Sequence, residues 1–158
     1  MNGQTDPHTL LVTTDWDRSF AAAVEAGGYK IEDASSNVTE GILPPRGGTG
    51  RTKTEITLLP PSQPLRLRYW MEALNYRKES RQKFAHPLSV LAIYEEHPEE
   101  EGKYPIFTIW KDGAGRFWSL EISGAYHRSL CVFGPRRDDI EIPGQWGAQD
   151  DRAAVVDK

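Results

Sequence analysis

Cysteine is nearly absent from this sequence, because Cys131 is the only one among 158 residues. A single cysteine forms no intramolecular disulfide, and no Cys/His pair stands at the spacing of a zinc site. Neither a disulfide scaffold nor a structural metal is therefore expected, and a reducing, cytoplasmic compartment fits best. A chain of this length buries enough apolar surface to fold without such cross-links.

Long hydrophobic runs are missing as well. The first apolar run, Leu10 to Val12, is far shorter than a membrane span or the core of a signal peptide. We therefore expect no targeting segment and no membrane partner.

Recognisable catalytic motifs are also lacking. The Gly-rich stretch 47–54 has Thr52, not Gly, before Lys53, and a strand pattern follows it where a phosphate-binding loop leads into a helix. Acidic pairs such as Asp15 and Asp17 complete no metal-binding pattern, so no metal or cofactor is expected.

Charge is unevenly distributed along the chain. The whole sequence carries a net charge of −4, yet residues 46–86 contain nine basic and three acidic residues, so the remainder is strongly acidic. The net charge argues against a generic polyanion binder, but its distribution matters more than its sum. This basic segment is the most unusual feature of the composition, and it could bind an acidic partner.

The N-terminal half predicts short strands and two helices. Strands are expected at 10–13 and 29–32, on either side of a helix over 17–26 that Asp15 or Asp17 caps and that glycines end. A Gly- and Pro-rich loop follows, with a mobile tip at 44–51. Alternating residues at 52–59 and 65–70 predict a hairpin, and 71–84 predicts a helix, with a start of that helix near Leu65 as the alternative.

The second half predicts a four-strand antiparallel meander over 88–133. Runs rich in β-branched and aromatic residues occupy 88–95, 104–111, 116–123 and 127–133, and turn sequences separate them. Trp118, Leu120 and Ile122 are expected to face the core, while Phe117 faces the opposite side of the sheet. We expect both faces to be covered, giving a single α+β domain over 1–134.

The C-terminal segment 135–158 reads as a polar tail, disordered beyond about Gly147. One part of it is apolar and is expected to act as an interaction segment. Whether this part docks onto the domain is not decided by the sequence. Its residues are Ile140, Ile142 and Trp146.

The candidate binding residues for an acidic or nucleic-acid partner lie in the basic segment. Cations on one strand face and one helix face suit a phosphate backbone, and a neighbouring aromatic ring suits base stacking. These residues are Arg66, Arg68, Arg77, Lys78, Arg81 and Trp70. The alternative interpretation is a solvated charged face that balances the acidic loop 95–101.

Histidine supplies the only candidates for catalysis, because an imidazole titrates near neutral pH. His127 precedes the last predicted strand beside Arg128 and Ser129, and His97 lies in the acidic loop. Both have an ordinary structural interpretation as turn or loop residues.

The sequence thus favours a non-enzymatic binding module that recognises another protein or an acidic partner, with nucleic acid as one such partner. A small hydrolase or nuclease using His127 or His97 is the first alternative. A self-assembling structural subunit is the second, and the module itself is expected to be a monomer or a small homo-oligomer.

Overall fold

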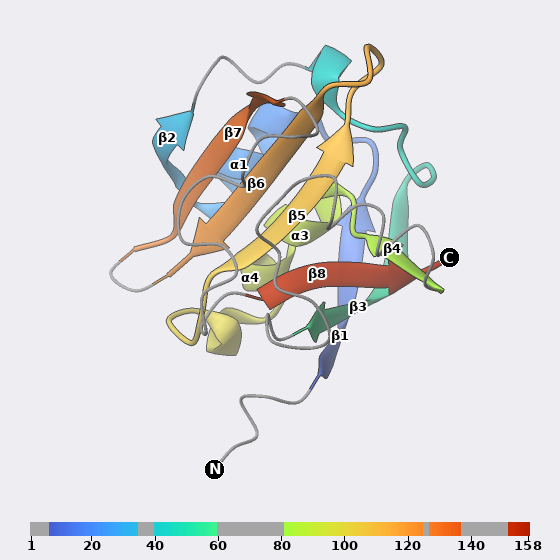
Figure 1. The fold of residues 1–158 in the computed structure, drawn as a ribbon. Coiled ribbons are helices and arrows are strands. Elements are labelled where there is room, and N and C mark those ends of the chain that lie inside the picture. The colour runs from blue at the N-terminus through green and yellow to red at the C-terminus, as the bar shows by residue number, and fades with distance from the viewer. Residues whose placement is uncertain (1–6, 35–39, 60–80, 125–126, 137–151) are drawn as a thin grey trace.

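The structure, a computed structural model, describes residues 7–34, 40–59, 81–124, 127–136 and 152–158 (Figure 1). In this part of the chain eight strands form one sheet in the order β1-β3-β8-β5-β6-β7-β2, and β4 pairs with β8 off this path. The strands are β1 (His8–Asp15), β2 (Lys30–Ala34), β3 (Arg51–Leu59), β4 (Gln82–Phe84), β5 (Ile106–Lys111), β6 (Phe117–Ser123), β7 (Ser129–Arg136) and β8 (Arg152–Asp157).

Short helices pack on one face of this sheet, behind the strands in the view of Figure 1. The α-helices are α1 (Phe20–Gly27), α3 (Pro87–Leu91) and α4 (Ile93–Glu96), and the 3-10 turns are η2 (Glu40–Ile42) and η3 (Pro98–Glu100). None of the helices in the described ranges is long and apolar enough to cross a membrane.

The sheet buries side chains on both faces, as the alternation of Phe117 and Trp118 predicts. Trp118, Leu120 and Ile122 join the main core under the helices, and Phe107 and Phe117 belong to a second cluster on the opposite face. Each fully buried aliphatic or aromatic side chain stabilises the fold by about 1.5 to 3 kcal/mol.

The N-terminal elements confirm the strands at 10–13 and 29–32 and the helix between them, but the predicted cap is wrong. Ser19 caps α1, because its side chain accepts a hydrogen bond from the amide of Ala22 at 3.0 Å. Asp15 and Asp17 lie too early in the chain and instead bind the residues around Gly50 and Arg51.

The meander is shorter than predicted. Strands β5, β6 and β7 confirm the three runs after residue 104, and Asp112 forms the first tight turn by accepting from the amides of Ala114 and Arg116. The run 88–95 is not a strand: it forms α3 and α4. This segment is buried on all sides, so its apolar residues show no helical period and resemble a buried strand.

The helix over 71–84 is contradicted at its end, because residues 82–84 form strand β4. Residues 71–80 and the second hairpin strand at 65–70 lie outside the described residues. The first hairpin strand is confirmed as β3, which pairs with β1 and β8.

The prediction of a disordered tail is wrong for residues 152–157, which form β8 in the middle of the sheet. Ala153, Ala154 and Val155 are at most 3% exposed. Arg152 is also buried, and its guanidinium lies 4.4 Å from the ring centre of Tyr104. The apolar residues of β8 are only two alanines and two valines, and charged residues flank them. The segment therefore reads as polar in the sequence.

Candidate functional site

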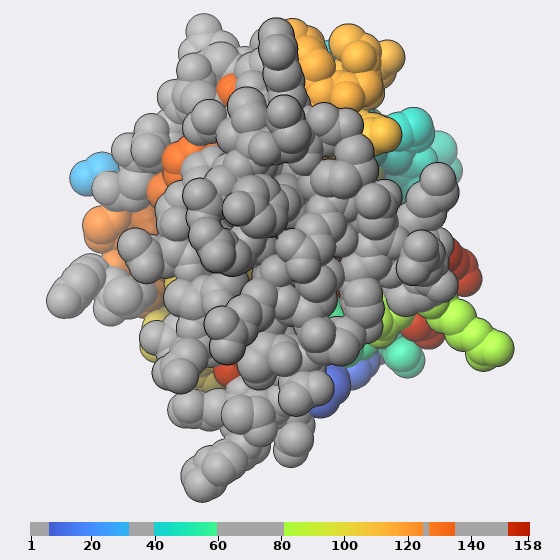
Figure 2. Space-filling model, viewed as in Figure 1, coloured from blue at the N-terminus to red at the C-terminus, as the bar shows by residue number. Residues whose placement is uncertain are grey.

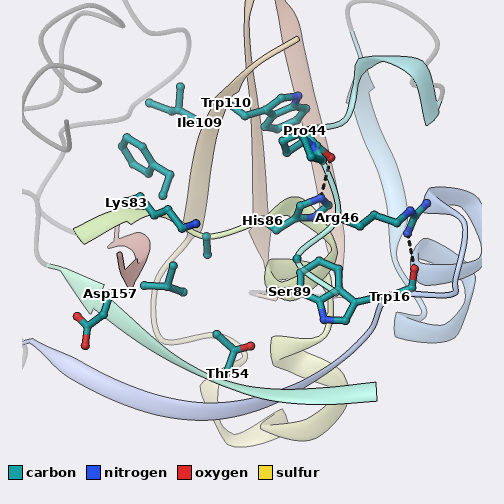
Figure 3. A pocket seen from close by; sticks show the side chains of 15 residues that line it. Trp16, Pro44, Arg46, Thr54, Lys83, His86, Ser89, Ile109, Trp110 and Asp157 are labelled. Carbon is teal, nitrogen blue, oxygen red and sulfur yellow. Dashed lines mark hydrogen bonds between the residues drawn. The ribbon is translucent and has the colours of Figure 1, made fainter. Parts of the chain in front are cut away.

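A cavity of about 580 Å³ lies where the sheet divides, between the end of β5 and the β4–β8 pair (Figure 3). Trp110 and Ile109 line one side of it and Lys83 lines the other. The loop 44–47, Trp16 and the first turn of α3 complete the wall. A cavity of this volume is within the usual range of ligand sites.

His86 connects two walls of the cavity. Its Nδ1 accepts a hydrogen bond from the amide of Leu88 at 3.1 Å and so caps α3, and Pro87 occupies the first turn. Its Nε2 therefore carries the proton and donates to the carbonyl of Pro44 at 3.0 Å. The His86-Pro87 step thus begins helix α3.

The environment of His86 holds its imidazole neutral. Burial, helped by the positive charges of Arg46 and Lys83, lowers the pKa of His86 to about 4, although the hydrogen bond to Pro44 acts in the opposite direction. Because both ring nitrogens already bind backbone groups, His86 is a structural link and not an acid-base catalyst.

Arg46 fixes the loop that forms the outer wall. Its guanidinium donates to the carbonyls of Trp16 and Arg18 at 2.8 and 2.7 Å, and it pairs with Glu40. The positive charge of Arg46 is thus partly neutralised, and its contacts hold 44–47 against the segment between β1 and α1.

The glycines of the Gly-rich stretch serve packing. A Cβ at Gly47 would lie 2.8 Å from the Trp16 ring, and Gly50 has a φ of 64°, which favours glycine. The Trp16 indole is itself held, because its Nε1 donates to the Thr52 hydroxyl at 2.7 Å. These contacts account for the stretch without a phosphate ligand.

Lys83 is the cation that faces the cavity. Figure 3 shows its side chain extending from β4 toward the centre, while the carboxylate of Asp157 points away. Within the described ranges no acidic side chain forms an ion pair with Lys83. The site therefore presents an ammonium group without a described acidic partner beside aromatic and aliphatic walls.

Further cations lie within two residues of the cavity lining in the chain. Arg81 precedes Lys83 in the chain, and the amide of Lys158 donates to its carbonyl at 2.8 Å. Lys111 ends β5, and Arg81, Lys111 and Lys158 are all exposed. In Figure 2, β4 and the end of β8 reach the surface together at the right-hand edge of the molecule.

A second, smaller cavity of about 320 Å³ lies between β1 and α4. Its charged groups already bind one another: Arg18 donates to Glu95 at 2.9 Å, and Glu96 accepts from the amide and hydroxyl of Thr13. Within the described ranges no group of three or more His, Cys, Asp and Glu residues could hold a metal ion.

The histidines singled out from the sequence do not line either cavity. His97 caps α4, and its two ring nitrogens lie 2.7 Å from the Leu11 carbonyl and 3.1 Å from the Glu99 carboxylate. His127 is exposed just before β7. Neither His97 nor His127 is therefore placed beside a possible nucleophile in either of these two cavities, as far as the described residues show.

The other predicted site residues are only partly placed. Arg81 is exposed beside β4, near Lys83. The remaining ones lie outside the described residues: Arg66, Arg68, Trp70, Arg77, Lys78, Ile140, Ile142 and Trp146.

The sequence analysis missed Trp16, His86 and Trp110 as site residues. The proline at the first position of α3 was the available signal for His86, since proline is common there. No local pattern marks Trp16 or Trp110, which come together only through the sheet. Compared with models of protein families, with curated proteins and with solved structures, the chain matches none.

Proposed function

We propose that the protein is a non-enzymatic binding module that recognises an acidic segment of a partner protein at the cavity between β4 and β5. The observation that carries this proposal is the ammonium group of Lys83, which forms no ion pair with an acidic side chain of the described residues and lines a cavity with aromatic and aliphatic walls. A carboxylate placed there gains a charge-assisted hydrogen bond in a partly desolvated site.

The position of the two ends of the basic segment supports this assignment. Arg46 and Lys83 belong to opposite ends of the segment 46–86, and the fold brings both to one cavity. Arg46 holds the wall in place, which leaves Lys83 to meet the partner. A ligand site whose walls are already formed loses less free energy to ordering on binding.

The experiment uses a library of synthetic octapeptides with Glu or Asp at alternate positions and a matched library with Gln or Asn. We expect members of the acidic library to bind, and binding to weaken about tenfold in Lys83→Gln, measured by fluorescence anisotropy. Lys30→Gln is the control, because it removes the same charge from the exposed surface of β2 at the far edge of the sheet.

Two results contradict the proposal. One is the absence of any binder in the acidic library. The other is equal affinity of the best binder for the wild-type protein and for Lys83→Gln.

A further inference from the structure

The two strands beside the cavity diverge. β5 and β8 run parallel, but they pair only through Ile106 with Arg152 and Phe107 with Ala153. Beyond that point β4 occupies the edge of β8. Ala85 marks the branch, because its amide donates to the Ala154 carbonyl at 2.9 Å and its own carbonyl accepts from the Thr108 hydroxyl at 2.5 Å.

The divergence exposes an edge of β5 to the cavity. The amide of Arg152 donates to the carbonyl of Pro105 at 2.9 Å, so the backbone groups of residue 105 point toward β8. Backbone groups of alternate residues in a strand point to the same edge. Those of Ile109 and Lys111 therefore point into the space between β5 and β4, where no strand of the described part of the chain pairs with them.

We propose that an extended acidic segment of the partner enters this space and adds a strand to the edge of β5 at Ile109 and Lys111. This inference rests on the proposed function and specifies how the same site binds. The backbone of Ile109 supplies main-chain hydrogen bonds, and the ammonium of Lys83 meets an acidic side chain. Strand addition gains affinity from the main chain and specificity from alternate side chains.

Charge complementarity identifies the occupant. Lys83 lines the cavity, and three further exposed cations stand within two residues of its lining residues in the chain, at Arg81, Lys111 and Lys158. An acidic segment is drawn to this group, whereas a segment rich in Lys or Arg is repelled. A second copy of this chain and a nucleic acid are the competing occupants that the test separates.

The test uses the tightest octapeptide from the acidic library. Two versions are made, each N-methylated at alternate residues, so that each removes the amide donors from one edge of the peptide strand. We expect one version to bind at least about tenfold more weakly and the other to stay within about threefold of the parent. Because the protein is unchanged, no folding defect enters the comparison.

Amide exchange of the full-length protein provides a second, independent measurement. Binding of the parent peptide is expected to slow exchange of the amides of Ile109 and Lys111 at least about tenfold, as followed by NMR. The amide of Lys30, on the opposite edge of the sheet, is expected to be unaffected.

Four other outcomes overturn the inference. If both methylated peptides bind as the parent does and still depend on Lys83, strand addition is wrong while the proposed function stands. If no acidic peptide shows Lys83-dependent binding, the proposed function fails as well. If an oligonucleotide competes more strongly than the peptide, nucleic acid is the partner. If the free protein sediments as a dimer that protects Ile109, a second copy is the occupant.

Discussion

At the scale of single residues, the cavity wall depends on one neutral histidine. His86 is neutral at pH 7 and makes both of its hydrogen bonds in that form. Protonation of Nδ1 would remove the acceptor that caps α3, and the cap would be lost. The ring also packs edge-on against Trp16, with the centroids 5.0 Å apart, so this one side chain joins α3, the loop and Trp16.

The low pKa of His86 sets a direction for the dependence of stability on pH. The folded protein takes up this proton near pH 4 and the unfolded chain near 6.5, so the unfolded state binds more protons between these values. The contribution of His86 to the free energy of unfolding is complete above about 6.5 and is lost as the pH falls toward 4. Urea denaturation from pH 4 to 8 measures it. In His86→Gln the free energy of unfolding should fall less between pH 6.5 and 4 than in the wild type.

Gly47 allows a second prediction at this scale. An alanine Cβ would lie 2.8 and 3.0 Å from two atoms of the Trp16 ring, which Thr52 holds in place. We expect Gly47→Ala to lower the free energy of unfolding by about 1 to 3 kcal/mol. Gly48→Ala is the matched control, because its nearest contact is an ordinary 3.4 Å and neither glycine has a positive φ. Equal stabilities of the two variants in urea would show that the Trp16 contact is unimportant.

At the scale of elements, the outer edge of β1 is closed by side chains. β1 ends the strand order of the described sheet, and no other described strand pairs with its second edge. His97 bonds to the Leu11 carbonyl, and Glu96 accepts from the Thr13 amide. Edge strands left open are sites of unwanted pairing, and these two contacts protect this edge.

His97 should give a pH dependence opposite in sign to that of His86. Partial burial lowers the pKa of His97, but its hydrogen bonds to the Leu11 carbonyl and to Glu99 outweigh burial and raise the pKa above 6.5. The stabilisation is present below that value and is lost as the pH rises through the folded pKa. His97→Ala should remove this loss between pH 6 and 9 in urea denaturation. A wild-type protein whose stability does not fall over this range relative to the variant would contradict the contact.

The same elements show what the sequence could predict. Runs rich in β-branched and aromatic residues predicted β5 and β6, because such residues favour strands, and the Asp112-Gly113 sequence between them predicted the turn. The run 88–95 was misassigned because a helix buried on every side has no polar face. The three residues of β4 carry no pattern at all, and the cavity needs β4 as one wall. Local sequence patterns could therefore predict several individual strands, but they could not predict the cavity that the strands form together.

At the scale of the whole molecule, one short strand holds two sub-sheets together. β1 and β3 lie on one side of β8, and β5, β6, β7 and β2 lie on the other. Among the described strands, β8 alone pairs with both groups: residues 153–155 pair with β3, and Arg152 and Ala153 pair with β5. The pairing brings the last residues of the sequence beside residues 57–59 and 106–107, which is a long-range contact that no local pattern reveals.

This arrangement predicts that removal of residues 152–158 abolishes folding, although the segment is only seven residues long and reads as polar. Deletion removes the ladders to β3, β4 and β5 and the buried Ala154 and Val155, so the two groups of strands lose their connection. Far-UV circular dichroism should show loss of the sheet, and amide exchange should show that few amides are protected.

Ala154→Asp should also prevent folding, because it places a carboxylate at a position that is 0% exposed. Asp157→Ala, at an exposed position of the same strand, is the control and should stay folded. A cooperative urea transition in the truncated protein would show that the sheet does not depend on β8.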